Sequence, residues 1–450
     1  MRVARRELTA AALGALLVAA AFVLPRLHWG VRPRTDVGQE RFGTHTGAAP
    51  IFGAWEIHAS WGTGPAIAIA AAAVAAGPAL AQRLSWRLLT LSTWATACGW
   101  AFALAMIDGW QRGFAGRLTT RDEYLSQVPS ITDIPATLRT FASRIVDYQP
   151  NSWTTHVSGH PPGALLTFVW LDRIGLHGGA WAGLLCLLAG SSAAAAVLIA
   201  VRALADERTA RRAAPFVAVA PTAIWIAVSA DGYFAGVAAW GTALLAVAVH
   251  REVRFPALTA AAAGLLLGWG VFCNYGLMLM GLPALAVLAS AADWRAALRA
   301  LGPATVAAVA VASTFAVAGF YWFDGYNLVQ QRYWQGIAKD RPFQYWSWAN
   351  LASVVCAIGL GSVAGISRVF DAAAIRRRSG FHLLLLGVLA AVACADLSML
   401  SKAEVERIWL PFTVWLTAAP ALLPVRSHRV WLGLNAVGAL LLNTVIVTNW

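Results

Sequence analysis

Charged side chains are scarce in this sequence. Only 12% of its 450 residues are Asp, Glu, Lys or Arg, and 59% are apolar, whereas a soluble domain carries about 25% charged residues. A chain with so few charges cannot cover a surface that faces water on all sides. The composition therefore excludes an ordinary soluble domain and indicates an integral membrane protein.

The motifs of nucleotide-dependent enzymes and of serine hydrolases are also missing. The sequence has no Walker loop, no dinucleotide-binding fingerprint and no nucleophile elbow. Its five cysteines show no metal-ligand spacing, and we expect them to be small buried hydrophobic residues. In the segment 26–64, His28, His45, Glu56 and His58 match no compact metal motif either. We therefore assign no metal ligands from the sequence.

Long apolar stretches dominate what is present, and they predict an all-α polytopic fold. The stretches are rich in Ala and Leu and lack the period-2 alternation of strands, and backbone inside hydrocarbon must satisfy its own hydrogen bonds. We expect about 11–13 transmembrane helices. Thirteen windows qualify, near 8–25, 65–82, 88–107, 179–201, 213–230, 233–250, 257–273, 275–291, 301–320, 347–366, 381–399, 408–424 and 430–448.

The first of these windows also resembles a signal peptide, because it follows Arg2, Arg5 and Arg6. No A-x-A-like cleavage site comes after it, so we expect an uncleaved first span.

Basic residues give the chain an orientation. The net charge of +13 comes almost wholly from arginine, since only Lys339 and Lys402 are lysines. With the N-terminus in the cytoplasm, every predicted inner loop is short and Arg-rich, as the positive-inside rule requires. This pattern accounts for the charge without a nucleic-acid partner. The abundance of Arg, Ala and Trp suggests a bacterial host, and hence a multi-pass protein of the plasma membrane.

Three long segments then fall outside: 26–64, 108–178 and 321–346. They hold most of the acidic residues and histidines, which indicates a reaction or binding site on the outer face. The segment 108–178 predicts a helix at about 134–148 lying in the membrane interface, and a second interfacial or re-entrant helix around 164–171.

The order of landmarks in this region resembles the GT-C superfamily of membrane glycosyltransferases, especially the branch of protein O-mannosyltransferases and lipid A aminoarabinose transferases. That branch has an Asp-Glu pair in its first large outer loop, then an interfacial helix, a His-Pro-Pro or Lys-Pro element, an Arg-rich inner loop and a Ser-x-Asp-like element. Here these would be Asp122-Glu123, the helix near 134–148, His160-Pro161-Pro162-Gly163, 203–212 and Ser229-Ala230-Asp231.

The resemblance covers about 88–250, which would form a GT-C-like catalytic core. Residues 1–87 would add two spans with an outer loop, and 251–450 would add further membrane helices with the outer loop 321–346. The two extra spans before residue 88 depart from the simplest family pattern. They leave open which helix corresponds to the family's first.

The resemblance implies an outer-face glycosyltransferase that uses a polyprenyl-phosphate sugar and a glycan, lipid or protein acceptor of the cell envelope. Because no cytoplasmic domain exists to bind a nucleotide sugar, the sequence itself favours a lipid-linked donor. A carboxylate can take the proton of the acceptor hydroxyl. We predict Asp122 for this role with Glu123 beside it, and Asp108, closer to the membrane, as the competing candidate.

Further residues would bind substrate. His156 and His160 could bridge to a phosphate oxygen or orient a carboxylate. Asp231, at the end of a span, could contact the acceptor, a metal or a partner arginine. The charge of the leaving phosphate needs fixed cations, and we predict Arg332, Arg341 and Arg407, although Arg407 is equally suited to pairing with Glu404 or Glu406. A divalent metal cofactor stays an open question.

Each landmark also has an ordinary structural interpretation: a solvated loop for the acidic pair, a helix end for Asp108 or Asp231, a helix cap for His160, and lipid headgroups for the arginines. Two other functions fit the sequence less well. A transporter or flippase of lipid-linked glycans would bury ionisable groups near the membrane midplane, where only Asp396 comes close. A non-catalytic assembly factor would look much like a degenerate transferase. The sugar is not encoded in any motif, and mannose and arabinofuranose are the candidates.

Overall fold

The computed structural model describes residues 5–27, 29–31, 33–34, 47–251 and 253–449. Eight helices in this part of the chain are long and apolar enough to cross a membrane. Each coincides with a predicted span, which confirms the all-α polytopic fold. They are α1 (Arg5–Val23), α3 (Thr63–Arg83), α4 (Trp86–Ala105), α8 (Gly179–Leu204), α10 (Ala230–His250), α11 (Pro256–Cys273), α13 (Trp294–Val317) and α18 (Gly380–Leu397).

The other five predicted spans are broken or fall short of these criteria. They comprise α9 (Glu207–Ala218) with the 3₁₀ turn η7 (Pro221–Trp225), η8 (Tyr275–Met280) with α12 (Gly281–Ala289), α15 (Phe343–Ile358) with α16 (Leu360–Ile366), α19 (Val405–Ile408) with α20 (Leu410–Leu416) and η10 (Ala419–Leu422), and α21 (His428–Val445). With the pair α15–α16 taken as one bent span, the described residues contain nine candidate spans, fewer than the thirteen apolar windows.

The bend between α15 and α16 has a clear local cause. The two helices meet at an angle of 108°, and the residue between them, Gly359, has a φ of +79°. Such a φ suits glycine, which has no Cβ. A Cβ here would also lie 2.5 Å from Oδ1 of Asn435. The 347–366 window is therefore apolar enough for one span, but its backbone forms two helices that run in different directions.

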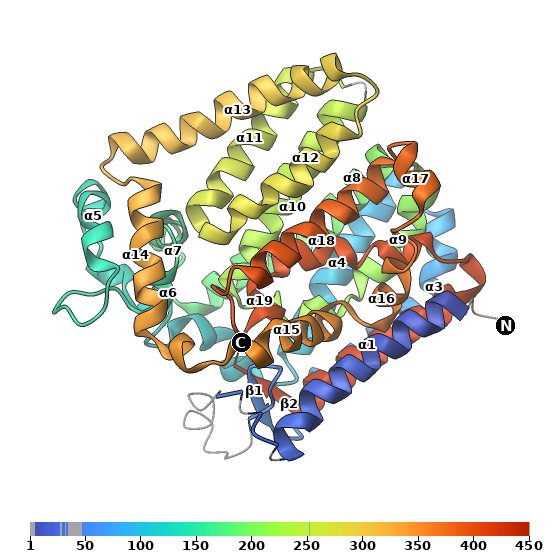
Figure 1. The fold of residues 1–450 in the computed structure, drawn as a ribbon, viewed down its shortest axis with the longest axis horizontal. Coiled ribbons are helices and arrows are strands. Elements are labelled where there is room, and N and C mark those ends of the chain that lie inside the picture. The colour runs from blue at the N-terminus through green and yellow to red at the C-terminus, as the bar shows by residue number, and fades with distance from the viewer. Residues whose placement is uncertain (1–4, 28, 32, 35–46, 252, 450) are drawn as a thin grey trace.

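At the centre of the molecule, α8 packs against α10 on one side and α4 on the other. Backbones approach closely at small residues: a Cβ on Gly236 of α10 would lie 2.2 Å from the carbonyl oxygen of Ala189 on α8. Small residues at helix contacts are typical of membrane bundles. Figure 1 shows α11, α12 and α13 grouped on one side of this centre and α1 beside α15 on the opposite side.

The N-terminal helix α1 is tied into the rest of the fold. It packs against α15 and α16. At one end Glu7 is buried and pairs with Arg368 at 2.6 Å, and near the other end the hydroxyl of Tyr345 donates to the carbonyl of Ala21 at 2.9 Å. The first apolar window thus forms an integral part of the described structure.

The long segment 108–178 folds as short helices without a long span. The helix expected near 134–148 is confirmed only in part, because α5 (Ile134–Thr140) is short and is followed by the 3₁₀ turn η6 (Ala142–Arg144) and then by bends. Helix α7 (Pro162–Arg173) confirms the short helix expected near 164–171. The remaining elements are the π turn η2 (Gln111–Ala115), η3 (Arg117–Thr119), η4 (Tyr124–Ser126), η5 (Val128–Ser130) and α6 (Thr155–Gly159).

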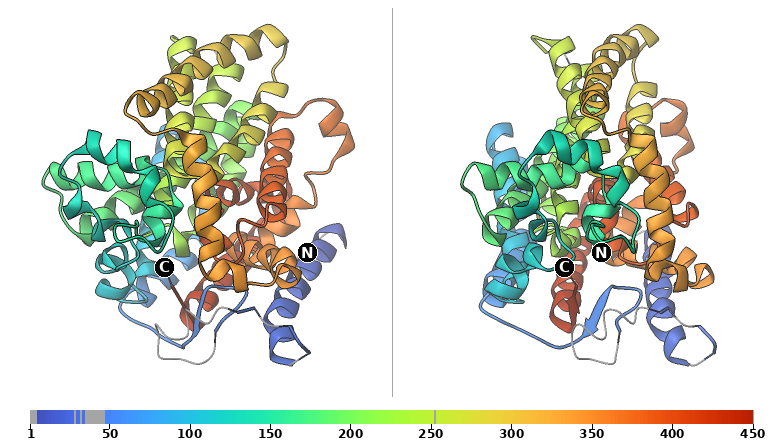
Figure 2. Two further views of the ribbon diagram at one scale, coloured as in Figure 1. Left: turned by 60° about the vertical axis from the view of Figure 1, so that its left-hand side comes forward. Right: turned by 90° about the vertical axis from the view of Figure 1, so that its left-hand side faces the viewer.

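Helix α14 (Trp322–Gln335) lies against this segment through α6 and η6, and both views of Figure 2 show it beside the short helices. Turn η9 (Ile337–Asp340) follows it. The smaller remaining elements are η1 (Leu24–Leu27), α17 (Ala372–Arg376), η11 (Val425–Ser427) and the two strands β1 (Gly53–Trp55) and β2 (Ile446–Thr448).

The strands pair antiparallel, with Gly53 opposite Thr448, and so join the first long segment to the C-terminal end of the chain. Elsewhere the expectation for cysteine is only partly correct. Cys186 and Cys273 are buried, but Cys394 is exposed on α18, where apolar surroundings would come from lipid.

Candidate functional site

The predicted acidic pair and the predicted histidines lie together. The backbone N–H of His156 donates to the carbonyl of Asp122 at 3.0 Å, which joins the start of α6 to the turn before η4. The two carboxylates of the pair then have different partners. Oδ1 of the partly exposed Asp122 accepts from the Thr155 hydroxyl at 3.1 Å, whereas Glu123, 3% exposed, lies 3.2 Å from Nδ1 of His156.

The next residue, Tyr124, brings in the second histidine. Its hydroxyl lies 2.9 Å from Nδ1 of His160, and the same nitrogen lies 2.7 Å from the carbonyl oxygen of His156. Because a carbonyl only accepts, Nδ1 carries a proton, and the neutral ring keeps Nε2 as its acceptor. Burial lowers the pKa of His160, against the opposing effect of Asp231. Burial also raises the pKa of Tyr124, so both side chains are neutral at pH 7.

Asp231 begins helix α10 and is almost fully buried, with 1% of its surface exposed. Ser229 caps this helix, since its Oγ accepts from the backbone N–H of Asp231 at 3.0 Å. The Asp231 carboxylate pairs with the guanidinium of Arg407. Its other oxygen, Oδ1, is buried and accepts no hydrogen bond from the described residues. Asp231 thus has an arginine partner, one of the three contacts considered for it, and a role in binding substrate stays a prediction.

Arg407 is held from two sides. Besides Asp231 it pairs with Glu404 at 3.0 Å, the neighbour that the sequence offered as one alternative. Glu404 in turn accepts from Arg341, also at 3.0 Å. The chain Asp231–Arg407–Glu404–Arg341 therefore links the start of α10, the turn into α19 and the segment before α15. We call these four residues the ion cluster.

Arg341 is fixed further by the neighbouring lysine. Its guanidinium donates to the carbonyl of Lys402 at 2.6 Å, and the Lys402 ammonium donates back to the carbonyl of Arg341 at 2.8 Å. Lys402 also lies 4.6 Å from the centre of the Trp334 ring. Two arginines and one lysine thus gather where α14, α15 and α19 meet.

The ion cluster and the histidine pair are neighbours in space. Asp231 and Arg407 both act electrostatically on His160, and both Asp231 and Glu123 act on Tyr124. His160 also contacts Phe234 of α10, with ring centroids 5.5 Å apart. Of the predicted residues, Glu123, His156, His160, Asp231, Arg341 and Arg407 therefore form one region, with Asp122 at its partly exposed edge.

Arg332 has a different environment. It pairs with Asp147 at 2.6 Å and donates to the carbonyl of Trp153 at 3.4 Å, so it holds α14 against the segment 108–178. Trp153 itself is buried beneath Arg144, whose guanidinium lies 3.2 Å from the ring centre. The contacts of Arg332 and of Arg144 therefore lie where α14 packs against the segment 108–178.

Asp108 also has its own partners. One carboxylate oxygen lies 2.6 Å from Nε2 of His58 and the other 3.4 Å from Arg117. Arg117 donates further to the carbonyls of Thr448 and Asn449, each at 2.9 Å. Asp108 thus anchors the first long segment and the C-terminal strand to the base of the 108–178 segment.

Three of these residues were not among the site residues predicted from the sequence. Tyr124 directly follows the predicted acidic pair, and that adjacency was the available signal. His58 and Arg117 carry no local motif. His28 and His45 lie outside the described residues. Within the part of the chain that is described, no three His, Cys, Asp or Glu side chains lie close enough to hold a metal ion.

The fold was compared with those of known proteins. No protein-family model and no curated protein matches the sequence. Among solved structures, the chain is similar to the Archaeoglobus fulgidus oligosaccharyltransferase in complex with Zn and sulfate, with 14% identity and a TM-score of 0.51 over 79% of this chain and 53% of that one. In its apo form the same enzyme gives 13% identity and a TM-score of 0.50 over 74% and 50%. This chain shares the fold of that oligosaccharyltransferase.

A third structure, ArnT from Cupriavidus metallidurans in the apo state, shares 16% identity over 75% of this chain and 59% of that chain, with a TM-score of 0.47. The chain spans about half the length of the oligosaccharyltransferase chains that it matches. The all-α, GT-C-like fold expected from the sequence agrees with the likeness to the oligosaccharyltransferase, and that likeness shows the fold alone.

Proposed function

We propose that this protein is a membrane glycosyltransferase that transfers a sugar from a polyprenyl-phosphate donor to an acceptor of the cell envelope. The observation that carries the proposal is the meeting of Glu123, His160, Asp231 and Arg407, which come from three segments far apart in sequence. Burying so many ionisable groups costs free energy. Such groups cluster at functional sites, and the GT-C fold is one that supports sugar transfer.

We assign the base to Glu123. As the acceptor oxygen attacks the anomeric carbon, its proton passes to this carboxylate and the bond from that carbon to the phosphate oxygen breaks. Of the two adjacent carboxylates, Glu123 faces the buried groups and Asp122 faces the Thr155 hydroxyl at the partly exposed edge. The contacts thus favour Glu123 over Asp122, and both over Asp108, which is engaged by His58 and Arg117.

The leaving group is the polyprenyl phosphate, whose negative charge must be stabilised. Arg407 and Arg341 are positioned for this by Glu404, which holds one guanidinium on each side. A guanidinium fixed in advance stabilises developing charge without reorganising. The unpartnered Oδ1 of Asp231 and Nε2 of His160 could each accept a hydrogen bond from a hydroxyl of the sugar or of the acceptor.

The orientation that goes with this function is the predicted one, in which the segments 26–64, 108–178 and 321–346 face outward. The ion cluster and the histidine pair are built mainly from these segments and from the outer end of α10. Mannose and arabinofuranose remain the candidate sugars, and a glycan, a lipid or a protein the candidate acceptor.

Transfer of radiolabelled sugar from polyprenyl-phosphate donors to membrane acceptors tests the proposal. Glu123→Gln keeps the shape of the side chain and removes its basicity. We expect it to lower turnover by about 10²–10⁴-fold, the usual contribution of a general base, with the protein still folded. Asp122→Asn is the matched control and should retain most of the activity.

Two results would count against this assignment. Loss of turnover in Asp122→Asn with little change in Glu123→Gln would move the base to Asp122. Absence of transfer from every donor by the intact wild-type protein would contradict the enzyme function itself.

One observation favours the flippase as the second candidate. Transporters use broken helices and ionisable groups within the membrane, and here α15 and α16 form a bent pair. Near it, Asp396 of α18 accepts from Asn350 of α15 at 2.8 Å. Movement of a fluorescent lipid-linked glycan across proteoliposomes, without any sugar transfer, would support that function.

A further inference from the structure

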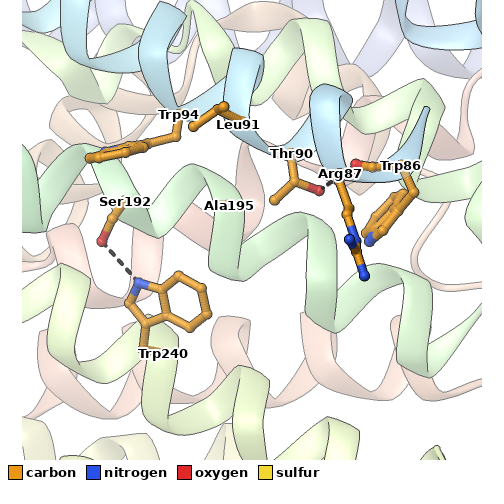
Figure 3. Close-up of a pocket in the computed structure, with 8 residues that line it drawn as sticks. All are labelled: Trp86, Arg87, Thr90, Leu91, Trp94, Ser192, Ala195 and Trp240. Atoms are coloured by element: carbon orange, nitrogen blue, oxygen red, sulfur yellow. Dashed lines mark hydrogen bonds between the residues drawn. The ribbon is translucent and has the colours of Figure 1, made fainter. Parts of the chain in front are cut away.

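A groove lies over α8, between α4 and α10. Its volume is about 450 Å³. Figure 3 shows Trp94 and Trp240 on either side of it, α8 as its floor, and Trp86 with Arg87 at one end. Its lining is formed by Trp86, Arg87, Thr90, Leu91, Trp94, Ser192, Ala195 and Trp240.

The polar groups that line the groove are almost all satisfied internally. The indole N–H of Trp94 donates to the carbonyl of Leu188 and to the Ser191 hydroxyl, at 3.3 and 3.1 Å. The indole N–H of Trp240 donates to the Ser192 hydroxyl at 2.9 Å, as Figure 3 shows. Both indole N–H groups therefore point toward α8, and aromatic and aliphatic surface faces the groove. A hydrocarbon chain fits such a lining, and a polar ligand does not.

Arg87 is the exception. Its side chain is exposed and has no hydrogen bond or ion pair to any described residue. The nearby Arg202 lies over the Trp86 ring at 4.3 Å and pairs at 2.7 Å with Glu207, a carboxylate that also pairs with Arg211. Among the residues that line the groove, Arg87 is the one cation, and no described carboxylate pairs with it. This end of the groove is therefore positively charged and suits an anion.

The dimensions match one leaflet of a bilayer. Trp86 and Trp94 are separated by eight residues of helix α4, which corresponds to about 12 Å along the helix. One leaflet contributes about 15 Å of hydrocarbon. Trp86 and Arg87 stand at the start of α4, close in sequence to Arg83 at the end of α3, and indole and guanidinium groups favour the headgroup level.

We propose that this groove binds one acyl chain of an anionic phospholipid, with the lipid phosphate against Arg87. The apolar lining specifies the chain, and the unpaired guanidinium specifies the anionic headgroup. The phospholipid belongs to the leaflet at the Arg-rich end of α4. This site is separate from the proposed catalytic region and does not depend on the proposed activity.

Native mass spectrometry of the full-length protein, titrated with phosphatidylglycerol or phosphatidylcholine, tests the proposal. The wild type should prefer phosphatidylglycerol. Arg87→Gln should weaken that lipid's binding about fivefold, the effect of one arginine at an anionic headgroup, and Arg87→Lys should restore it. Arg376→Gln is the matched control, because Arg376 is also exposed but lies on α17, and it should change nothing.

A second variant tests the chain rather than the headgroup. Ala195→Leu fills the floor of the groove without altering charge, and it should weaken binding of both lipids, with the melting temperature reporting that the fold is intact. Equal effects of Arg87→Gln and Arg376→Gln would overturn the proposal. So would a preference for undecaprenyl phosphate over phosphatidylglycerol that Arg87→Gln abolishes, because the groove would then be a site for the carrier lipid.

Discussion

Arginines occur in two regions of this molecule and behave differently in each. In the ion cluster, Arg407 and Arg341 are 5% exposed, and each is paired with carboxylates. Toward the other ends of the spans, Arg87, Arg208 and Arg376 are exposed, as residues that only orient the chain can be. The first group is held in place by the fold, at a cost in free energy for burying charge. The second group faces the membrane surface.

The largest effect should come from breaking the ion cluster. Arg407→Gln removes the cation between the buried Asp231 and the partly buried Glu404, and removal of one partner from a buried pair costs about 3–5 kcal/mol. We expect that loss in the free energy of unfolding in detergent. Arg376→Gln, in the accessible region, should change it by less than about 0.5 kcal/mol.

The double variant Asp231→Asn/Arg407→Gln sharpens this comparison, because it removes both charges of one pair. It should recover part of the loss seen in Arg407→Gln. Additive losses would mean that the two side chains are not coupled and that the pair is not as described.

A second prediction concerns Glu406, which lies beside the ion cluster at the start of α19 and is fully buried. Burial raises its pKa from about 4.5 to about 7, and its carboxylate accepts from the backbone N–H of Phe52 at 2.8 Å. Because the folded state binds this proton more tightly, its contribution is complete below pH 4.5 and is lost as the pH rises through 7. A rise in pKa from about 4.5 to about 7 corresponds to a change of roughly 3 kcal/mol in the free energy of unfolding across this pH range.

Glu406→Gln imitates the protonated side chain. Melting temperatures measured from pH 4.5 to 8 should therefore fall less steeply in this variant than in the wild type, with the two closest at the acidic end. A variant that tracks the wild type at every pH would show that Glu406 does not titrate in this range.

A third prediction tests the anchoring role of Asp108. Asp108→Asn removes the charge shared by His58 and Arg117, which should cost about 1–3 kcal/mol of folding free energy. Burial lowers the pKa of His58, but its hydrogen bond with Asp108 raises that pKa, and the net shift is upward. That contribution is complete below pH 6.5 and fades at higher pH, so the variant should lose more stability at pH 6 than at pH 8.5.

Sugar transfer gives the control for the same variant. If Asp108 only anchors strands and segments, turnover at a temperature where the variant is folded should fall less than in Glu123→Gln. A loss as large as that of Glu123→Gln would return Asp108 to the role of base.

The smallest effect is expected at Arg332. Its partner Asp147 has 38% of its side chain exposed, and exposed pairs contribute about 0–1 kcal/mol. Arg332→Gln should therefore change the unfolding free energy by less than 1 kcal/mol and leave the affinity for the donor unchanged. A strong loss of donor binding would mean that Arg332 belongs to the phosphate site after all.

The sequence predicted local features well. Apolar windows located the eight long helices, and the spacing of Ile134, Leu138 and Phe141 indicated the short helix before α6. The order of Asp122-Glu123 and His156 to His160 placed these residues in one region, because they share one segment and only short helices separate them. The order of these residues in the sequence could not show which of them form hydrogen bonds with one another.

Pairings between distant segments were not predictable in the same way. Arg332, Arg341 and Arg407 looked alike as outer cations, yet packing of α14 directs the first to Asp147, while α19 and the segment before α15 direct the others to Glu404. Breaks inside apolar windows were also hidden, since hydropathy does not register a positive φ at Gly359 or the turn η7. Both depend on how helices pack, which a single sequence does not display.

The most direct test asks whether the ion cluster receives the lipid phosphate. Binding of undecaprenyl phosphate should be measured for the wild type, Glu123→Gln and Asp231→Asn/Arg407→Gln, each at a temperature where it is folded. The account predicts that Glu123→Gln binds the carrier as the wild type does, because the base acts only in the chemical step, and that the double variant binds at least tenfold more weakly, about 1.4 kcal/mol. Unchanged carrier binding in the folded double variant would contradict the account.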